Sequence, residues 1–119
     1  MEQELSFVLS HIRVGRQNAQ TYKDLSAKTG LSQRALQMAV EELRVNHEQP
    51  LCSASDQPAG IYMATTSQEL ETWAAMQRER ARSLLRSSWA IKKTARKWKV
   101  QEDQSRRENS LPGEVTLGL

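Results

Sequence analysis

The chain has 119 residues, 38% of them hydrophobic and 5% aromatic, and carries a formal net charge of +3. This length allows one small domain with an appendage. No apolar run approaches the roughly 20 residues of a membrane span, and the first residues lack the basic and apolar segments of a signal peptide. The single cysteine, Cys52, cannot form an internal disulfide, so a reducing, cytoplasmic setting is expected.

The charge is distributed unevenly along the chain. Residues 1–66 carry six Lys or Arg and seven Asp or Glu, whereas residues 78–99 carry nine and one. A polyanionic partner would therefore be attracted mainly by the second half of the chain.

The first half is predicted to contain three short helices. Residues 2–14 show apolar residues at helical spacing, and Gly15 is expected to end that helix. Thr21 is a good N-cap for a second helix that Gly30 ends, and Ser32 caps a third. The inward face of the third helix is expected to consist of Leu36, Ala39, Val40 and Leu43.

A β-hairpin is predicted next, from about Leu51 to Ala64. The segments "PLCSA" and "GIYMAT" are short and apolar, and the turn-forming stretch "SDQPA" separates them. Three helices followed by a hairpin is the order of a winged helix-turn-helix. We therefore predict a mainly α fold with a winged helix-turn-helix domain at residues 1–65.

The sequence "YKDLSAKTGLSQRALQMAVEELR…PLCSA…GIYMATTSQEL" resembles winged-helix domains of the biotin-ligase-repressor type. It is most similar to small winged-helix proteins of bacteriophages and bacteria, and the resemblance covers about residues 2–70. It implies that the third helix enters the major groove of double-stranded DNA and that the hairpin wing lies against the backbone or the minor groove. It also implies a transcriptional regulator or replication accessory protein in the cytoplasm of a bacterial host cell.

The resemblance assigns DNA contacts to two sets of side chains in the first half. The second helix offers Lys23 and Lys28 to phosphates, and the third helix offers Ser32, Gln33, Arg34, Gln37 and Met38 to base edges, with Glu41 further along. Two features depart from the pattern. Met38 replaces a basic residue, and the wing "SASDQPA" has no Lys or Arg. An ordinary solvated helix face and a protein-docking surface therefore remain alternatives.

The second half is predicted to begin with one long helix over residues 66–103, because Thr66 is a good N-cap and no Gly or Pro occurs before Pro112. Two sets of residues recur every seven positions along it, which is the pattern of a coiled coil. They are Leu70, Gln77, Leu84, Ile91 and Trp98, and Ala74, Ala81, Ser88 and Ala95. We expect this seam to form a homodimer; packing back onto the first half is the alternative.

A basic stripe lies beside the seam. It consists of Arg78, Arg82, Leu85, Trp89, Lys92, Arg96 and Lys99. We assign Arg78, Arg82, Trp89, Lys92 and Arg96 to DNA contact, and Leu85, like Trp73, to packing. An acidic protein surface is the alternative partner of this stripe. Trp89 could then pack into that partner, or it could stack on the bases of a single strand. Residues 104–119 lose the periodicity and are expected to form a flexible tail.

The motifs of enzymes and metal sites are absent from the sequence. His11, His47 and Cys52 do not have zinc-ligand spacing, and no phosphate-binding glycine loop or nucleophile motif occurs. We therefore expect neither an enzyme nor a cofactor or metal. Two functions remain: a dimeric DNA-binding protein, or an interaction protein that uses both halves to bind and modulate a host protein.

Overall fold

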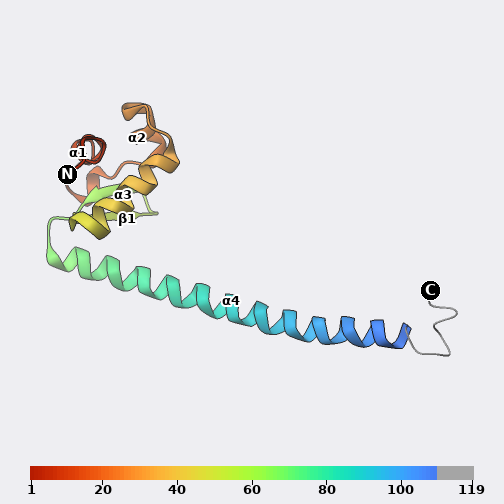
Figure 1. Ribbon diagram of the computed structural model, residues 1–119. Coiled ribbons are helices and arrows are strands. Elements are labelled where there is room, and N and C mark those ends of the chain that lie inside the picture. The colour runs from red at the N-terminus through yellow and green to blue at the C-terminus, as the bar shows by residue number, and fades with distance from the viewer. Residues whose placement is uncertain (110–119) are drawn as a thin grey trace. The chain divides into compact units, whose positions relative to one another are not determined.

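The computed structural model describes residues 1–109 of the chain. In chain order its elements are α1 (Gln3–Ser10), the 3-10 turn η1 (Arg16–Asn18), α2 (Tyr22–Thr29), α3 (Gln33–His47), β1 (Leu51–Ala54), β2 (Gly60–Met63) and α4 (Ser67–Asn109) (Figure 1). This confirms the predicted mainly α fold, in which helices and a hairpin precede one long helix. The order of elements is compatible with a winged helix.

The chain divides into two units, Met1–Met76 and Gln77–Leu119. The first unit thus contains the helices, the hairpin and the first turns of α4. Its boundary lies beyond residue 65, where the sequence placed the end of the domain, because Trp73 packs against β1. The second unit, as far as the structure describes it, consists of the rest of α4.

The core of the first unit collects the apolar faces of its helices and its sheet. Leu25 of α2 and Leu36, Val40 and Leu43 of α3 are completely buried. The remaining members of the buried cluster are Leu5, Val8, Ile12, Ala39, Leu51 and Ile61. This confirms the predicted inward face of α3. The prediction could be made from the sequence because helical spacing determines which side chains of a helix share the buried face.

The hairpin pairs β1 and β2 in antiparallel register, with Cys52 opposite Tyr62. The free edge of β2 is covered by the segment between α1 and α2, since Gln20 exchanges two backbone hydrogen bonds with Ile61. A Cβ on Gly60 would lie 1.9 Å from the Gln20 carbonyl oxygen. This close approach, together with a φ of 121°, requires glycine at position 60.

The first helix is shorter than the sequence predicted. α1 ends at Ser10, whereas the prediction extended it to residue 14 and ended it at Gly15. The Phe7 carbonyl oxygen accepts hydrogen bonds from the Ser10 hydroxyl and the His11 ring. Beyond that point the backbone of residues 13–15 pairs with Met63 of β2. Pairing with a strand far away in the sequence therefore ends this helix.

The long helix α4 extends further than predicted. Thr66 caps it as expected, since its hydroxyl accepts a hydrogen bond from the Glu69 N–H. The expected end at residue 103 is wrong, because α4 continues to Asn109. Asp103 and Arg107 stand at a spacing that favours continuation of the helix. Residues 104–109 are thus helical rather than part of a flexible tail, and residues 110–119 of that prediction lie outside the described residues.

Candidate functional site

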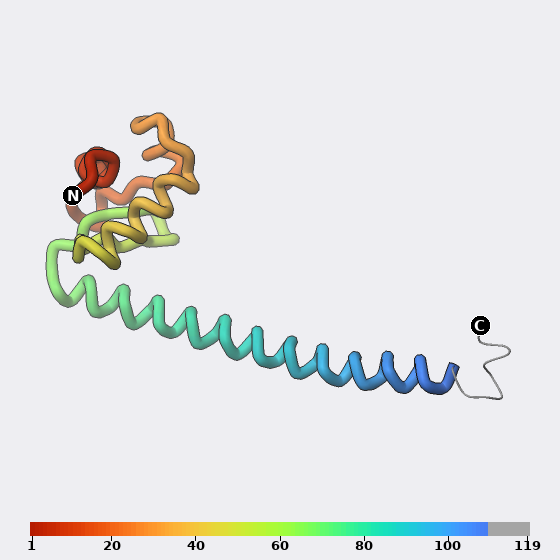
Figure 2. The backbone as a smooth tube through the Cα atoms, viewed as in Figure 1, coloured from red at the N-terminus to blue at the C-terminus, as the bar shows by residue number. Residues whose placement is uncertain are grey.

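The connection between α2 and α3 is held by a dense set of local hydrogen bonds. Gly30 ends α2 with a φ of 77°. The Thr29 hydroxyl accepts from the Leu31 N–H at 3.2 Å, and the Ser26 hydroxyl donates to the Leu31 carbonyl oxygen. Ser32 then caps α3 by accepting from the Ala35 N–H at 3.1 Å. Figure 2 traces the tight turn of the chain between α2 and α3. This turn fixes the direction in which the first turn of α3 faces.

The outward face of α3 presents the predicted reading residues to solvent. Ser32, Gln33, Arg34, Gln37 and Met38 are all exposed, and Met38 retains 64% of its surface. They lie on the side of α3 opposite the buried core residues. The structure therefore brings all five together at the start of one helix.

The same face changes character after its second turn. Glu41 and Glu42 are exposed, and together with Gln37 and Met38 they line a shallow hollow on α3. Val45, one further turn along, is 67% exposed. The face is thus polar and cationic where α3 begins, and acidic with exposed apolar side chains further along. This gradient limits any contact with a phosphate backbone to the first two turns.

The two predicted phosphate-binding lysines of α2 differ in their surroundings. Lys23 is exposed and has no hydrogen bond within residues 1–109. Gln20 is buried, and with its side-chain amide turned to satisfy its neighbours, the amide oxygen accepts from the Lys28 ammonium group and the amide nitrogen donates to the His11 carbonyl oxygen at 2.9 Å. Lys28 therefore has an intramolecular partner that a phosphate would have to compete with. Sequence reasoning missed Gln20, since a single glutamine in a loop gives no signal of burial.

The wing carries a cation that its own sequence does not contain. Arg16 of η1 donates from its guanidinium to the Pro58 carbonyl oxygen at 2.6 Å and to the Asp56 carbonyl oxygen at 2.9 Å. The same guanidinium lies 5.8 Å from the centre of the Tyr62 ring. Arg16 is partly exposed, so it adds positive charge to a hairpin tip where the sequence indicated none. The two partners are 42 and 40 residues away in sequence, so no local motif could reveal them.

The first turns of α4 are attached to the hairpin. The Trp73 indole N–H donates to the Ser53 carbonyl oxygen at 3.1 Å, and the Arg44 guanidinium lies 4.5 Å from the ring centre. Arg44 in turn donates from Nε to the Leu51 carbonyl oxygen at 2.7 Å. The expectation that Trp73 is a packing residue is confirmed. Arg44 was missed, because its role depends on contacts with both β1 and α4.

The predicted seam residues lie along one side of α4 and are largely exposed. Leu84, Ile91 and Trp98 retain 72%, 70% and 63% of their surface, and Leu70 retains 36%. The small residues Ala74, Ala81, Ser88 and Ala95 are exposed between them. Large apolar side chains that recur in a regular row along a helix are usually buried by a partner.

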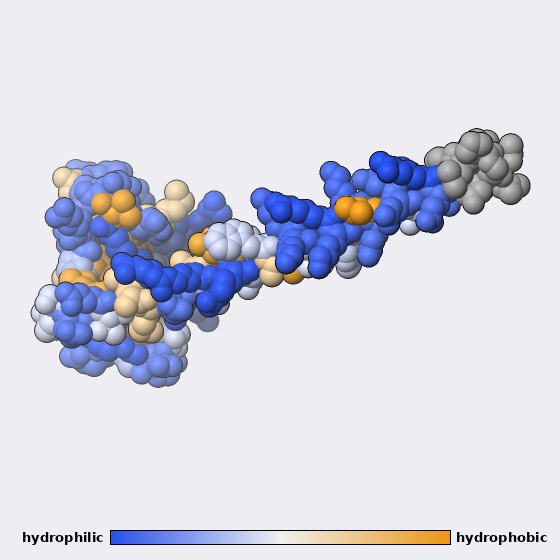
Figure 3. Space-filling view, turned by 90° about the horizontal axis from the view of Figure 1, so that it is seen from below, coloured by the Kyte–Doolittle hydropathy of each residue, from blue (hydrophilic) through white to orange (hydrophobic). Residues whose placement is uncertain are grey.

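The predicted basic stripe is also exposed. Arg78, Arg82, Trp89, Lys92 and Arg96 all face solvent, as does Leu85, which was assigned to packing but is 50% exposed. Arg82 forms an ion pair with Glu79 at 3.3 Å, and both side chains are highly exposed. Figure 3 shows the largely hydrophilic surface of α4, with separate apolar side chains on it.

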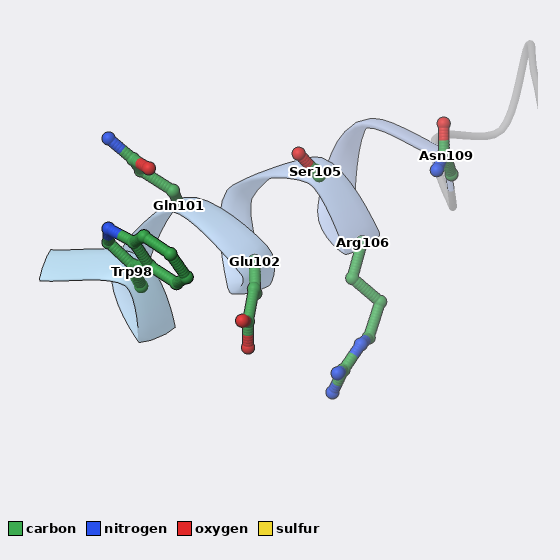
Figure 4. A pocket seen from close by; sticks show the side chains of 6 residues that line it. All are labelled: Trp98, Gln101, Glu102, Ser105, Arg106 and Asn109. Carbon is green, nitrogen blue, oxygen red and sulfur yellow. The ribbon is translucent and has the colours of Figure 1, made fainter. Parts of the chain in front are cut away.

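A hollow lies near the end of α4. It is lined by Trp98, Gln101, Glu102, Ser105, Arg106 and Asn109 (Figure 4). All of these side chains come from successive turns of the same helix. The hollow is therefore an open groove along one helix surface and offers no enclosed volume for a small molecule.

Three titratable groups of the first unit have shifted pKa values: the buried Cys52 and Tyr62 and the half-buried Tyr22. Burial raises the pKa of the Cys52 thiol, and the nearby Arg44 guanidinium partly offsets this. Burial likewise raises the pKa of Tyr62 and of Tyr22. Burial thus favours the neutral form of all three groups.

Residues 1–109 contain neither a metal-binding cluster nor a membrane-spanning helix. No group of three or more His, Cys, Asp or Glu side chains in that part of the chain is placed to hold a metal ion. No helix in the same residues combines the length and apolar character needed to cross a bilayer. Comparisons of the chain with protein-family models, with curated proteins and with solved structures found no match.

Proposed function

We propose that this protein binds double-stranded DNA as a homodimer and acts as a transcriptional regulator or replication accessory protein of a bacteriophage or bacterium. The first unit would serve as a winged helix-turn-helix of the biotin-ligase-repressor type, and α4 would pair two copies and hold the phosphate backbone. The proposal includes a cytoplasmic location and no catalytic activity.

The observation that carries the proposal is the first turn of α3. The caps at Thr21 and Ser32 and the left-handed Gly30 orient this turn away from the core. Gln33, Arg34 and Gln37 are exposed there, and these side chains suit the base edges of the major groove: Gln pairs with adenine and Arg with guanine. The N-terminus of a helix also attracts phosphate oxygens.

Charge on α4 supports the same proposal. Residues 78–99 carry nine Lys or Arg and one Glu. Contacts between such side chains and phosphates provide most of the non-specific affinity for DNA. The partly exposed Arg16 adds a cation at the wing, where a winged helix meets the backbone.

Selection from a random duplex library at low salt tests this proposal. The full chain is expected to enrich one short sequence, and excess single-stranded competitor is expected to leave that enrichment intact. A pool without enrichment would contradict the proposal. If the single-stranded competitor displaced all of the duplex from the protein, Trp89 and its basic neighbours would instead bind a single strand.

A protein partner is the second candidate function. The observation that favours it is the pair of highly exposed apolar side chains, Met38 and Val45, beside Glu41 and Glu42 on the outward face of α3. Flexible methionine side chains are common on protein-binding surfaces. A capture experiment from host lysate, with and without nuclease, separates the two. A host protein retained after nuclease treatment supports this candidate, whereas a retained fraction that nuclease removes supports DNA binding.

A further inference from the structure

The seam on α4 consists of two rows with different side-chain sizes. One row holds the larger side chains Leu70, Gln77, Leu84, Ile91 and Trp98, and the other holds Ser67, Ala74, Ala81, Ser88 and Ala95. Each member of the second row precedes a member of the first by three positions, so the rows lie side by side on the helix surface. The relation between these two rows restricts how a second helix can pack on them.

We propose that two copies of the chain pair through α4 in antiparallel orientation, with facing seam residues whose numbers add up to 165. This inference rests on the proposed homodimer and assigns its orientation and register. The paired region runs from Ser67 to Trp98, so the starts of the two α4 helices are separated by about 46 Å along the axis at 1.5 Å per residue. The two first units then join the pair at opposite ends.

The sizes of the side chains favour this orientation. In the proposed register Ala74 faces Ile91 of the second copy, and Ala81 faces Leu84 of the second copy. Ala95 faces Leu70 and Ser67 faces Trp98 in the same way, so every layer combines one small and one larger side chain. In a parallel pair in register, each row would face itself. Layers of two alanines would then leave voids, and the one layer of two Trp98 side chains would be crowded; both lower stability.

The polar seam residues select this register among the antiparallel alternatives. Gln77 is half-buried and makes no hydrogen bond within the described residues. In the proposed register its amide faces the hydroxyl of Ser88 of the second copy, and the symmetry of the pair repeats this contact. A shift by one heptad in either direction would place Gln77 opposite Ala81 or Ala95. A buried amide without a partner is costly, so such shifts are disfavoured.

Charge provides an independent argument for the same register. In a parallel pair, residues 78–99 would face the same segment of the second copy. Each of these segments has a net charge of +8, so they would repel each other. In the proposed pair they face residues 66–87, which carry four Lys or Arg and three Asp or Glu, a balance of +1. Glu71 also comes beside Lys92 of the second copy at both ends of the pair. Both side chains are exposed and have no ion pair within residues 1–109.

Disulfide trapping in the full chain tests the orientation. Ala74→Cys and Ile91→Cys are made separately, one of them with a size tag, and the two proteins are mixed before mild oxidation. A mixed disulfide between positions 74 and 91 is expected to dominate, because only facing residues reach the separation that a disulfide requires. Unsubstituted protein is the control, since Cys52 is completely buried. Equal amounts of homodisulfides at each position would overturn the antiparallel pair.

A charge exchange tests the register without cysteines. Glu71→Lys is expected to weaken dimerisation on the order of tenfold, since two exposed ion pairs become repulsive. Adding Lys92→Glu is expected to restore it, whereas Lys93→Glu, on the outer side of α4, is not. Dimer dissociation constants from sedimentation give the readout. Equal rescue by both second substitutions, or by neither, would overturn the register.

Duplex binding is measured on the same samples, so that the two proposals fail separately. A mixed disulfide in protein that does not bind duplex would overturn the proposed function and support the pairing. Homodisulfides in protein that binds a specific duplex would overturn the pairing and support the function.

Discussion

The indole N–H of Trp73 donates to the carbonyl oxygen of Ser53 at 3.1 Å, and this bond attaches the start of α4 to strand β1. The Arg44 guanidinium over the Trp73 ring extends the contact to α3. The first turns of α4 are therefore part of the folded first unit, which ends at Met76.

Trp73→Phe is expected to lower the free energy of unfolding by about 0.5–1.5 kcal/mol, because the Ser53 carbonyl oxygen loses its indole donor. Urea denaturation followed by circular dichroism measures the change. Trp89→Phe is the matched control. Trp89 is 65% exposed and makes no hydrogen bond within residues 1–109, so its change is expected to stay within about 0.5 kcal/mol. Equal effects of the two substitutions would contradict the proposed role of the Trp73 bond.

Arg34→Ala is expected to reduce discrimination at one base pair by about 1–3 kcal/mol, because an arginine fork on guanine is lost. Binding to the selected duplex and to its single-base variants measures this. Arg13→Ala removes the same charge from an exposed position outside α3. It is expected to leave the order of preference among the variants unchanged. If Arg34→Ala weakened binding to every variant equally, Arg34 would contact phosphate rather than a base.

Much of the first unit could be predicted because its signals are local. Thr21, Gly30 and Ser32 act on backbone groups within a few residues, and they occupy the predicted caps. The spacing of Leu36, Ala39, Val40 and Leu43 likewise gave the buried face of α3, and hence the exposed face where the reading residues were placed.

Long-range contacts account for what the sequence did not predict. The end of α1 depends on pairing of residues 13–15 with Met63, and the charge at the wing depends on Arg16 reaching the carbonyl oxygen of Pro58. The contact between Lys28 and the buried Gln20 also joins residues from different elements. None of these partners is marked by a spacing rule, so propensity and periodicity could not place them.

Stability is expected to decrease at alkaline pH because the pKa values of Cys52, Tyr62 and Tyr22 are raised. The unfolded chain releases the Cys52 proton near the ordinary pKa of 9.0, while the folded chain retains it to higher pH. Between these two values the folded state binds more protons, so the free energy of unfolding falls as pH rises. The urea midpoint is expected to be constant at neutral pH and to decline above 9.0. In Cys52→Ala the decline should begin closer to 10.0, the ordinary value for Tyr62 and Tyr22. The same onset in both proteins would contradict the role of Cys52.

Arg96→Gln is expected to reduce the slope of log binding constant against log salt concentration by about 0.9, the value for one lost phosphate contact. Arg80→Gln is the matched control, since position 80 lies on the opposite side of α4, next to the proposed pairing surface. Its slope is expected to match that of the unsubstituted protein. Identical slopes for all three proteins would show that Arg96 does not contact a phosphate in the proposed complex.

The claim that two copies pair through α4 is tested most directly by the molar mass of the full chain in solution. Sedimentation equilibrium is expected to give twice the 13.5 kDa of a single chain, and Leu84→Glu, which places a charge in the seam, is expected to give one chain mass. A mass of 13.5 kDa for the unsubstituted protein, at concentrations where it binds duplex, would contradict the account.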